Sequence, residues 1–300
     1  MNRAVRSFST SQWYRTSSLE LEWALLQQLR RKDIDLVHFL WGERDLGYFP
    51  IVKLFNAKPL CCTFHACQDD LPQILAFKER LRSLNAIIIM SETQRAFFES
   101  AGIPSDKIHF IPHGIDTDFF TPPAVKKTLD EFTVLSVGSY RRNFLLLREV
   151  ALKLRSHRDI KIKFVGAKAF SEHFSDLDNV EFLNRLTDLE LLQLYQSASC
   201  LVLAIENATA NNALLESLAC GLPVVAEKVG GIPEYANSDC AVMVEEGNAD
   251  QMVEAIVELS ESQVRQEQMA QSARKRALEL SWSNTAIQTE KLYASMLNSL

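Results

Sequence analysis

Short apolar runs alternate with longer amphipathic stretches along almost the whole chain. Runs of about 4–8 apolar residues predict buried strands, and apolar residues that recur every three or four positions predict helices. The predicted strands are Ile34–Leu40, Leu60–Phe64, Ala86–Met90, Ile108–Ile111, Phe132–Val137, Ile160–Val165, Val180–Phe182, Cys200–Ile205, Val224–Ala226 and Ala241–Val244. The predicted helices are Leu19–Arg31, Gln73–Leu84, Glu92–Ala101, Phe144–Ser156, Asp188–Ser197, Asn212–Cys220, Ala249–Leu280 and Ser281–Leu300. Apolar strands between helices are typical of parallel sheets covered on both faces, so we expect an α/β protein with doubly wound, Rossmann-like domains.

A turn signal divides this series into two. The sequence Thr121-Pro122-Pro123 is followed by a charged stretch over residues 126–131, as is typical of a linker. We expect one domain over residues 1–122, a second over residues 123–280, and a cleft between them. The last helix, residues 281–300, is too short to be a domain, and we expect it to dock on the N-terminal domain. Capping boxes are predicted at Ser91 with Gln94 and at Thr187 with Glu190.

Composition narrows the protein class. The chain has 300 residues, a net charge of −6 and 47% hydrophobic residues, which excludes a mostly disordered chain and gives no sign of a duplex nucleic-acid binder. Its apolar runs are far shorter than the roughly 18–20 residues that a membrane span needs, and no secretory signal follows Met1, so we expect a cytoplasmic protein. Cys61, Cys62 and Cys67 with His65 fit no common zinc spacing, so we expect no metal and no cofactor.

The positions of the ten glycines exclude several enzyme classes. They form neither the G-x-G-x-x-G of dinucleotide sites nor the G-x-x-x-x-G-K-[ST] of the P-loop. The chain also lacks an H-E-x-x-H zinc motif and a G-x-S-x-G nucleophile elbow.

The most informative segment runs from Ala208 to Val225. A polar turn ending in Asn211 and Asn212 leads into a helix, and the exposed N–H groups of a helix start are suited to an anion. Glu216 follows about one turn later, on the same face as Asn212. A phosphate at the helix start and a hydroxyl group at Glu216 would suit a nucleotide. The alternative is an ordinary N-capped helix with a solvated glutamate.

Three segments together resemble the retaining, nucleotide-sugar-dependent glycosyltransferases of family 4. They are Ile111–Pro122, the strand Val134–Gly138 with Arg141-Arg142 after it, and Asn212–Val225 with the Gly-Gly loop up to Glu234. The resemblance implies the GT-B fold and transfer of a sugar, with retention and without a metal. The donor would be a UDP-, GDP- or ADP-sugar bound by the C-terminal domain, and the acceptor a sugar or lipid-linked group at the N-terminal domain.

The resemblance also implies site residues. The catalytic candidates are His65, Arg142 and Glu206, and the nucleotide-sugar-binding candidates are Gly138, Arg141, Arg142, Asn211, Asn212, Glu216, Gly230 and Gly231. Arg142 is expected to bind the diphosphate, since a guanidinium matches phosphate oxygens; the alternative is a solvated arginine. His65 is expected to touch the sugar or the acceptor; the alternative is a structural histidine.

Two departures from the family pattern keep other functions open. The family commonly has a glutamate at the position of Ala208, where Glu206 would substitute only if the loop bends differently. No lysine follows Gly138 at the usual distance. The alternatives are a non-catalytic GT-B protein that binds a nucleotide-sugar or supports a partner, and a nucleotide-sugar epimerase.

The start of the chain is a further departure. Family members open with a strand and a Gly-containing loop, then another helix and strand, and this chain begins roughly 40–50 residues too late for that opening. We therefore expect the chain alone to be poorly soluble or weakly active unless its N-terminal helix fills the gap. Residues 1–32 carry six basic side chains against Glu20 and Glu22, which would suit a peripheral contact with anionic lipid. The alternative is a helix that covers the core.

Overall fold

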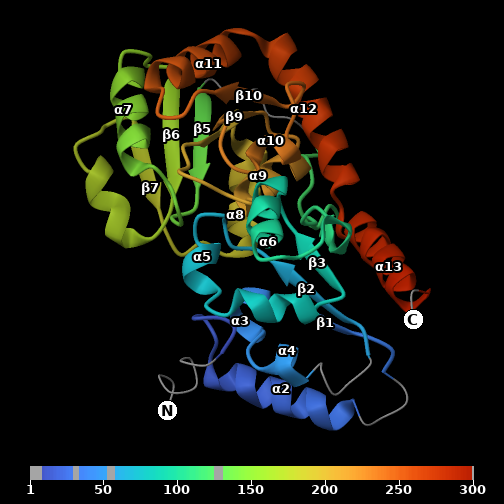
Figure 1. Ribbon diagram of the computed structural model, residues 1–300. Helices are drawn as coiled ribbons and strands as arrows, with labels where there is room; N and C mark the ends of the chain where they lie inside the picture. Colours follow the sequence, from blue (N-terminus) through green and yellow to red (C-terminus); the bar gives the residue numbers. More distant parts are fainter. Residues whose placement is uncertain (1–8, 30–33, 53–57, 125–130, 299–300) are drawn as a thin grey trace. The chain divides into compact units, whose positions relative to one another are not determined.

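The computed structural model describes residues 9–29, 34–52, 58–124 and 131–298 (Figure 1). Its contacts divide the chain into two compact units. Unit 1 contains the residues up to His113 and those from Thr285 onward, and unit 2 contains Gly114–Asn284. The residues of the last helix from Thr285 are therefore grouped with unit 1. The domain limits given from the sequence stay a prediction.

Unit 1 is built on a parallel sheet with the strand order β1-β2-β3-β4 among the described residues. Its elements are α2 (Thr16–Gln28), β1 (Val37–Phe39), α3 (Gly42–Asp45), α4 (Phe49–Val52), β2 (Leu60–Phe64), α5 (Leu71–Ile74), η2 (Lys78–Ser83), β3 (Ala86–Ile89), η3 (Glu92–Gln94), α6 (Arg95–Ser100), η4 (Ser105–Lys107) and β4 (Ile108–Phe110). Helix α13 (Trp282–Asn298) follows at the end of the chain. Val37 pairs with Leu60, and Cys61 with Ala86, so the carboxyl ends of the strands share one edge.

The predicted helix Gln73–Leu84 is wrong. Helix α5 ends at Ile74, and the chain forms the separate 3₁₀ helix η2 only from Lys78. Between them, the main chain pairs with an earlier segment: the Ala76 N–H donates to the Thr10 carbonyl (3.0 Å), and the Gln12 N–H to the Ile74 carbonyl (2.7 Å). These hydrogen bonds between distant residues replace the helical ones, a tertiary effect that local periodicity does not contain.

Helix α2 is attached to unit 1 by a buried carboxylate. Glu22 is 3% exposed and accepts hydrogen bonds from the Tyr14 hydroxyl (2.7 Å) and from the main-chain N–H groups of Gly47 (2.8 Å) and Phe49 (3.0 Å). Glu22 is therefore no part of a charged outer face.

Lipid contact stays a prediction, because Arg15 is the one basic side chain of residues 1–32 within the described ranges. In the part of the chain described, no helix is both long and apolar enough to span a bilayer.

Unit 2 contains a parallel sheet with the order β10-β9-β8-β5-β6-β7 among the described residues. Its elements are β5 (Phe132–Val137), α7 (Phe144–Leu154), β6 (Ile160–Val165), η5 (Lys168–Phe174), β7 (Val180–Leu183), α8 (Asp188–Ser197), β8 (Cys200–Leu203), α9 (Asn212–Ala219), β9 (Val224–Glu227), α10 (Ile232–Tyr235), β10 (Ala241–Val244), α11 (Ala249–Glu261) and α12 (Gln263–Glu279). After β5, the chain first adds β6 and β7 on one side of it, and then adds β8, β9 and β10 on the other side. The predicted doubly wound α/β sheet is confirmed in this unit.

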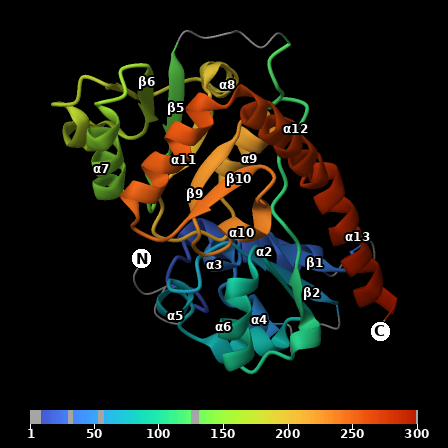
Figure 2. The same ribbon diagram turned by 90° about the horizontal axis from the view of Figure 1, so that it is seen from above.

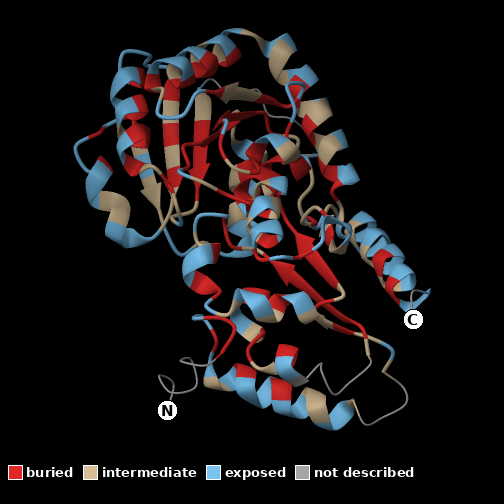
Figure 3. Ribbon diagram, in the orientation of Figure 1, coloured by how far each residue is buried: buried red, intermediate tan, exposed pale blue. Residues whose placement is uncertain are grey.

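Helices cover both faces of this sheet (Figure 2). Helices α8 and α9 pack on one face, where Leu135 and Leu201 point, and α7 and α11 pack on the other, where Val134 and Val202 point. The central strands are consequently buried along their length, as Figure 3 shows. This explains why they are continuous apolar runs in the sequence.

Local signals at helix ends are confirmed in part. The capping boxes of Ser91 with Gln94 and of Thr187 with Glu190 are both present. The predicted single helix Ala249–Leu280 is wrong, because Ser262 has an extended backbone (φ −128°) between α11 and α12. The Ser262 hydroxyl accepts a hydrogen bond from the Arg265 N–H (3.3 Å) and so begins a new helix.

Candidate functional site

The loops after β5 and β8 in unit 2 lie where the order of the sheet reverses. In doubly wound sheets, ligands bind at the carboxyl ends of the strands at this switch point. The loops are tied together by their main chains: the Asn143 N–H donates to the Ala204 carbonyl (3.1 Å), and the Glu206 N–H to the Arg141 carbonyl (2.9 Å). Residues far apart in sequence therefore form one continuous surface.

Arg142 is buried within the first of these loops. Arg142 is 7% exposed, and its guanidinium donates from Nε (3.0 Å) and Nη2 (2.6 Å) to the Val137 carbonyl. Gly138 has a φ of +102°, and a Cβ there would lie 2.9 Å from Arg142 Nη2, so the close approach requires glycine. The guanidinium thus holds the turn of its own loop.

Burial removes the Arg142 charge from water, and no described residue gives it a partner of opposite sign. Burial lowers the pKa of the guanidinium to about 10, and among the described residues no carboxylate lies within 4.0 Å of it. A buried cation without a counter-charge is costly, so an anion bound beside it would be stabilised. Arg141 follows the same turn in the left-handed region (φ +53°) and is half-buried.

The carboxylate of Glu216 is held by a residue that the sequence did not single out. The Tyr195 hydroxyl on α8 donates a hydrogen bond of 2.8 Å to Glu216 Oε2 on α9. Burial, with a smaller contribution from Asp188, raises the pKa of Glu216 to about 7, although the Tyr195 hydrogen bond acts in the opposite direction. Tyr195 is also an electrostatic neighbour of Arg142, so this buried phenol links two predicted site residues. A tyrosine within an amphipathic helix carries no local signal of such a role.

The start of α9 is capped by its own chain. Asn211 is buried, and its side-chain oxygen accepts a hydrogen bond from the Leu214 N–H (3.1 Å). Asn212 is exposed at the first helical position. The oxygen of Asn211 therefore serves as the N-cap, and the predicted anion site at this helix start stays a prediction.

The Gly-Gly loop after β9 packs against the loop after β8. The Gly231 N–H donates to the Ala208 carbonyl (2.8 Å), and a Cβ on Gly230 (φ +51°) would lie 2.2 Å from the same oxygen. Ala208 itself is buried, whereas the side chain of Glu206 is exposed. Only a glycine at position 230 allows these two loops to touch.

Glu227 is a second buried carboxylate that the sequence did not single out. It ends β9, is 1% exposed, and accepts hydrogen bonds of 2.6 Å from the N–H groups of Ile205 and Gly247. Burial raises its pKa. A charged residue directly after the apolar run Val224–Ala226 is the signal that could have found it. Glu227 fixes the chain where it leaves β8.

In unit 1, His65 follows the carboxyl end of β2. Its ring stacks on Trp41 with centroids 4.4 Å apart and lies edge-on to His113 at 6.3 Å. Trp41 follows β1 and His113 follows β4, so the three rings gather at one edge of this sheet. In the described ranges, no three His, Cys, Asp or Glu side chains are grouped as a metal site would require.

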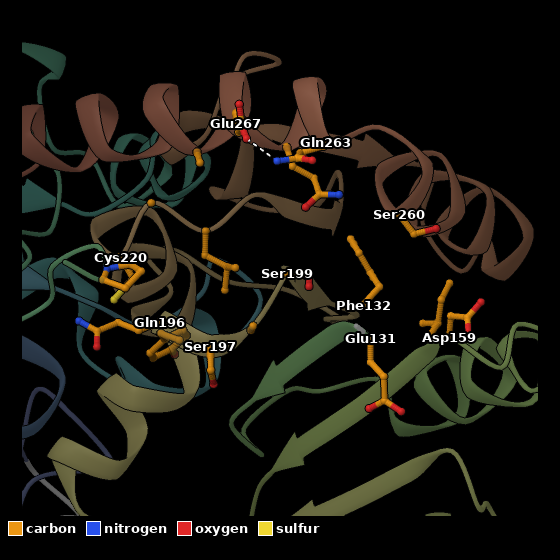
Figure 4. A pocket seen from close by; sticks show the side chains of 18 of the residues that line it. Glu131, Phe132, Asp159, Gln196, Ser197, Ser199, Cys220, Ser260, Gln263 and Glu267 are labelled. Atoms are coloured by element: carbon orange, nitrogen blue, oxygen red, sulfur yellow. Dashed lines mark hydrogen bonds between the residues drawn. The ribbon is translucent and has the colours of Figure 1, made fainter. Parts of the chain in front are cut away.

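A wide groove of about 1730 Å³ in unit 2 contains none of the predicted site residues (Figure 4). It lies at the amino ends of β5 and β6, where Phe132 and Ile160 begin these strands. Gln263, hydrogen-bonded to Glu267 (2.9 Å), lines it on the side of α12. The predicted residues lie instead at the carboxyl ends of the strands.

Two family models match the chain. Residues 3–119 match the model described as Glycosyltransferase Family 4, and residues 131–262 match the model described as Glycosyl transferases group 1. The chain belongs to glycosyltransferase family 4. The second match contains the loops after β5, β8 and β9, and the first contains His65.

Curated relatives of the chain are glycosyltransferases, and solved structures share its fold. The chain is 26% identical over 290 residues to a D-inositol 3-phosphate glycosyltransferase of Corynebacterium aurimucosum, covering 86% of this chain and 69% of the relative. It resembles a glycosyltransferase of Rickettsia africae (TM-score 0.77, 18% identity, 94% of this chain and 81% of that one). It also resembles Anabaena Alr3699/HepE in complex with UDP (TM-score 0.75, 16% identity, 92% and 82%). The predicted GT-B fold and glycosyltransferase class are confirmed; the cleft expected between its domains stays a prediction.

Proposed function

We propose that this family 4 glycosyltransferase moves a sugar from a nucleotide-sugar to a hydroxyl of a sugar or lipid-linked acceptor, with retention and without a metal. The observation that carries the proposal is the buried charge of Arg142 at the switch point of unit 2, which no carboxylate of the described residues compensates. The UDP bound by the Anabaena structure supports a nucleotide donor, and the inositol phosphate named for the Corynebacterium relative supports a hydroxylated ring as acceptor.

Each predicted donor residue has a role in this proposal. Arg142, with Arg141 beside it, binds the diphosphate, and Gly138 lets the main chain approach it closely. Asn211 and Asn212, at the positive end of α9, lie against the phosphate. Glu216 accepts hydrogen bonds from the ribose hydroxyls, with one of its oxygens held by Tyr195. Gly230 and Gly231 keep the loop after β9 against the loop after β8.

In the reaction, the bond between the anomeric carbon and the diphosphate oxygen breaks. The negative charge that develops on the leaving diphosphate is stabilised by Arg142 and the start of α9. The acceptor oxygen bonds to the same face of the anomeric carbon, and its proton leaves with the nucleoside diphosphate. Glu206 contacts the transferred sugar in place of the glutamate absent at Ala208, and His65 of unit 1 contacts the sugar or the acceptor.

A two-step experiment tests the proposal. A thermal-shift screen with UDP, GDP and ADP identifies the base through the largest rise in Tm, because a ligand that binds only the folded state stabilises it. The matching nucleotide-sugars are then incubated with the protein and with inositol phosphates or glycolipids. Mass spectrometry identifies the product, and NMR gives its anomeric configuration. Transfer with retention is expected; an inverted product would overturn the stereochemistry, and no stabilisation by any nucleotide would overturn the site.

Ala208 favours a second candidate, a protein that binds a nucleotide-sugar without transferring it. Its methyl side chain is buried and cannot accept a hydrogen bond from a sugar hydroxyl. Nucleotide binding without any product is the expected result for this candidate. An epimerase would instead return an isomerised donor in the same product assay.

A further inference from the structure

Unit 1 contains a fully buried carboxylate next to His65. Glu43 lies in α3 and is 1% exposed, although charged side chains are rarely buried without partners. Its Oε1 accepts hydrogen bonds from the main-chain N–H groups of His65 and Ala66, the latter at 2.6 Å. Glu43 therefore fixes the chain where it leaves β2.

The second oxygen of this carboxylate faces the histidine ring. Glu43 Oε2 is buried, has no hydrogen-bond partner among the described residues, and lies 3.8 Å from His65 Nδ1. A buried carboxylate oxygen without a donor is costly. A shift of about 1 Å would bring Oε2 to hydrogen-bond distance of Nδ1.

The plane of the ring is set by an aromatic neighbour. Trp41 stacks on it almost in parallel, with 16° between the planes. Because the two nitrogens lie on opposite sides of the imidazole, a ring with Nδ1 toward Glu43 presents Nε2 away from it. A carboxylate at Nδ1 favours the tautomer with the proton on Nδ1, which leaves Nε2 as a hydrogen-bond acceptor.

We infer that Glu43 is a positioning residue that holds the main chain of His65 and selects its Nδ1–H tautomer, so that Nε2 can accept a hydrogen bond from a sugar or acceptor hydroxyl. The contact of His65 with substrate rests on the proposed function. The pairing of Glu43 with His65 does not, so the two are tested separately.

The pairing is tested by NMR on the full chain, without substrate. Nitrogen-15 shifts of the His65 ring distinguish the two tautomers, and we expect Nδ1–H in the unmodified protein. In Glu43→Gln the amide N–H₂ can donate to Nδ1, so the Nε2–H tautomer should increase. Glu22→Gln is the matched control, because Glu22 is also a buried carboxylate of unit 1 that accepts main-chain N–H groups. An Nε2–H ring in the unmodified protein, or the same shift change in both variants, would overturn the inference.

The consequence for transfer is tested with a double-mutant cycle in kcat. We expect Glu43→Gln to lower kcat about tenfold when His65 is present, and less than about twofold in a His65→Gln background, since residues that act as a unit are not additive. If the reductions in kcat caused by the two single substitutions simply multiply in the double variant, Glu43 only supports the fold. Full activity of His65→Gln would overturn the proposed substrate contact of His65, while the NMR result would still decide the pairing.

Discussion

The Tyr195 hydroxyl donates a hydrogen bond of 2.8 Å to Glu216 Oε2, and so joins α8 to α9. Tyr195 is 1% exposed, whereas Glu216 is half-buried. One carboxylate oxygen is thus fixed by the interior of unit 2, and in the proposed function the other accepts a hydroxyl of the ligand. In the proposed function, a residue without a local sequence signal therefore takes part in nucleotide binding.

Tyr195→Phe should weaken nucleoside diphosphate binding about 2- to 10-fold in calorimetry. It removes one hydrogen bond, whose net contribution is about 0.5–1.5 kcal/mol, and it frees the carboxylate to rotate. Tyr293→Phe is the matched control, since its hydroxyl bonds to His38 Nδ1 in unit 1 (2.6 Å). We expect no change of nucleotide affinity there. Equal losses in both variants would contradict a specific role of Tyr195.

Glu216→Ala should weaken nucleoside binding by roughly 1.5–3 kcal/mol, the contribution of a hydrogen bond to a charged group. Affinity should also depend on pH. Because the pKa of Glu216 is about 7, its carboxylate is charged above pH 7 and protonated below it. Binding of a nucleoside, which carries no titrating phosphate, should therefore tighten as pH rises through 7. Calorimetry at several pH values checks this, and the same pH dependence in Glu216→Gln would exclude Glu216 as its source.

The same pKa predicts a change in the free energy of unfolding. A carboxyl whose pKa is raised from 4.5 in the unfolded chain to about 7 binds its proton more tightly when folded. Its stabilising effect is fully present below pH 4.5 and is lost as pH rises through 7. In urea titrations of the ligand-free protein, Glu216→Gln should remove this part of the pH dependence. An unchanged profile in the variant would contradict the shift.

The two arginines after β5 should respond differently to truncation. Arg142→Ala leaves the Val137 carbonyl without its donors, so Tm should fall together with the affinity for nucleoside diphosphate. Arg141→Ala should lower Tm less, because Arg141 is half-buried whereas Arg142 is buried, and it should lose affinity only for the diphosphate. Comparing nucleoside with nucleoside diphosphate isolates the phosphate contacts. An equal loss for both ligands in Arg142→Ala would show that this variant only damages the loop.

How much the sequence predicts depends on how local the cause is. Strands Leu60–Phe64, Phe132–Val137 and Ala241–Val244 were predicted to the residue, because continuous apolar runs between polar turns determine them. The capping boxes at Ser91 and Thr187 involve neighbours three residues apart and are equally local. Such features need no knowledge of the tertiary structure.

The wrong helix Gln73–Leu84 has a tertiary cause. Helix Gln73–Leu84 is interrupted because residues 74–76 pair with residues 10–12, more than 60 positions earlier. The site shows the same limit: motifs indicated Glu216 and His65, but their partners Tyr195 and Glu43 lie 21 and 22 residues away in other elements. The contacts that fix a site residue follow from the packing of elements, which periodicity does not describe.

Gly230→Ala should cost more stability than Gly247→Ala, although both residues have a positive φ (+51° and +71°). Either alanine carries the strain of the left-handed region, about 1–2 kcal/mol. At position 247 the new Cβ meets nothing within 4 Å, so the backbone strain should be the whole cost of the substitution. At position 230 it would lie 2.2 Å from the Ala208 carbonyl, which must move and take the loop after β8 with it. We therefore expect a larger fall in the free energy of unfolding for Gly230→Ala, and a loss of nucleotide affinity that Gly247→Ala does not share. Urea titration and calorimetry of both variants check this. Equal destabilisation by the two variants would show that the contact between the loops after β8 and β9 does not contribute to stability. Normal nucleotide binding by Gly230→Ala would show that this contact does not support the donor site.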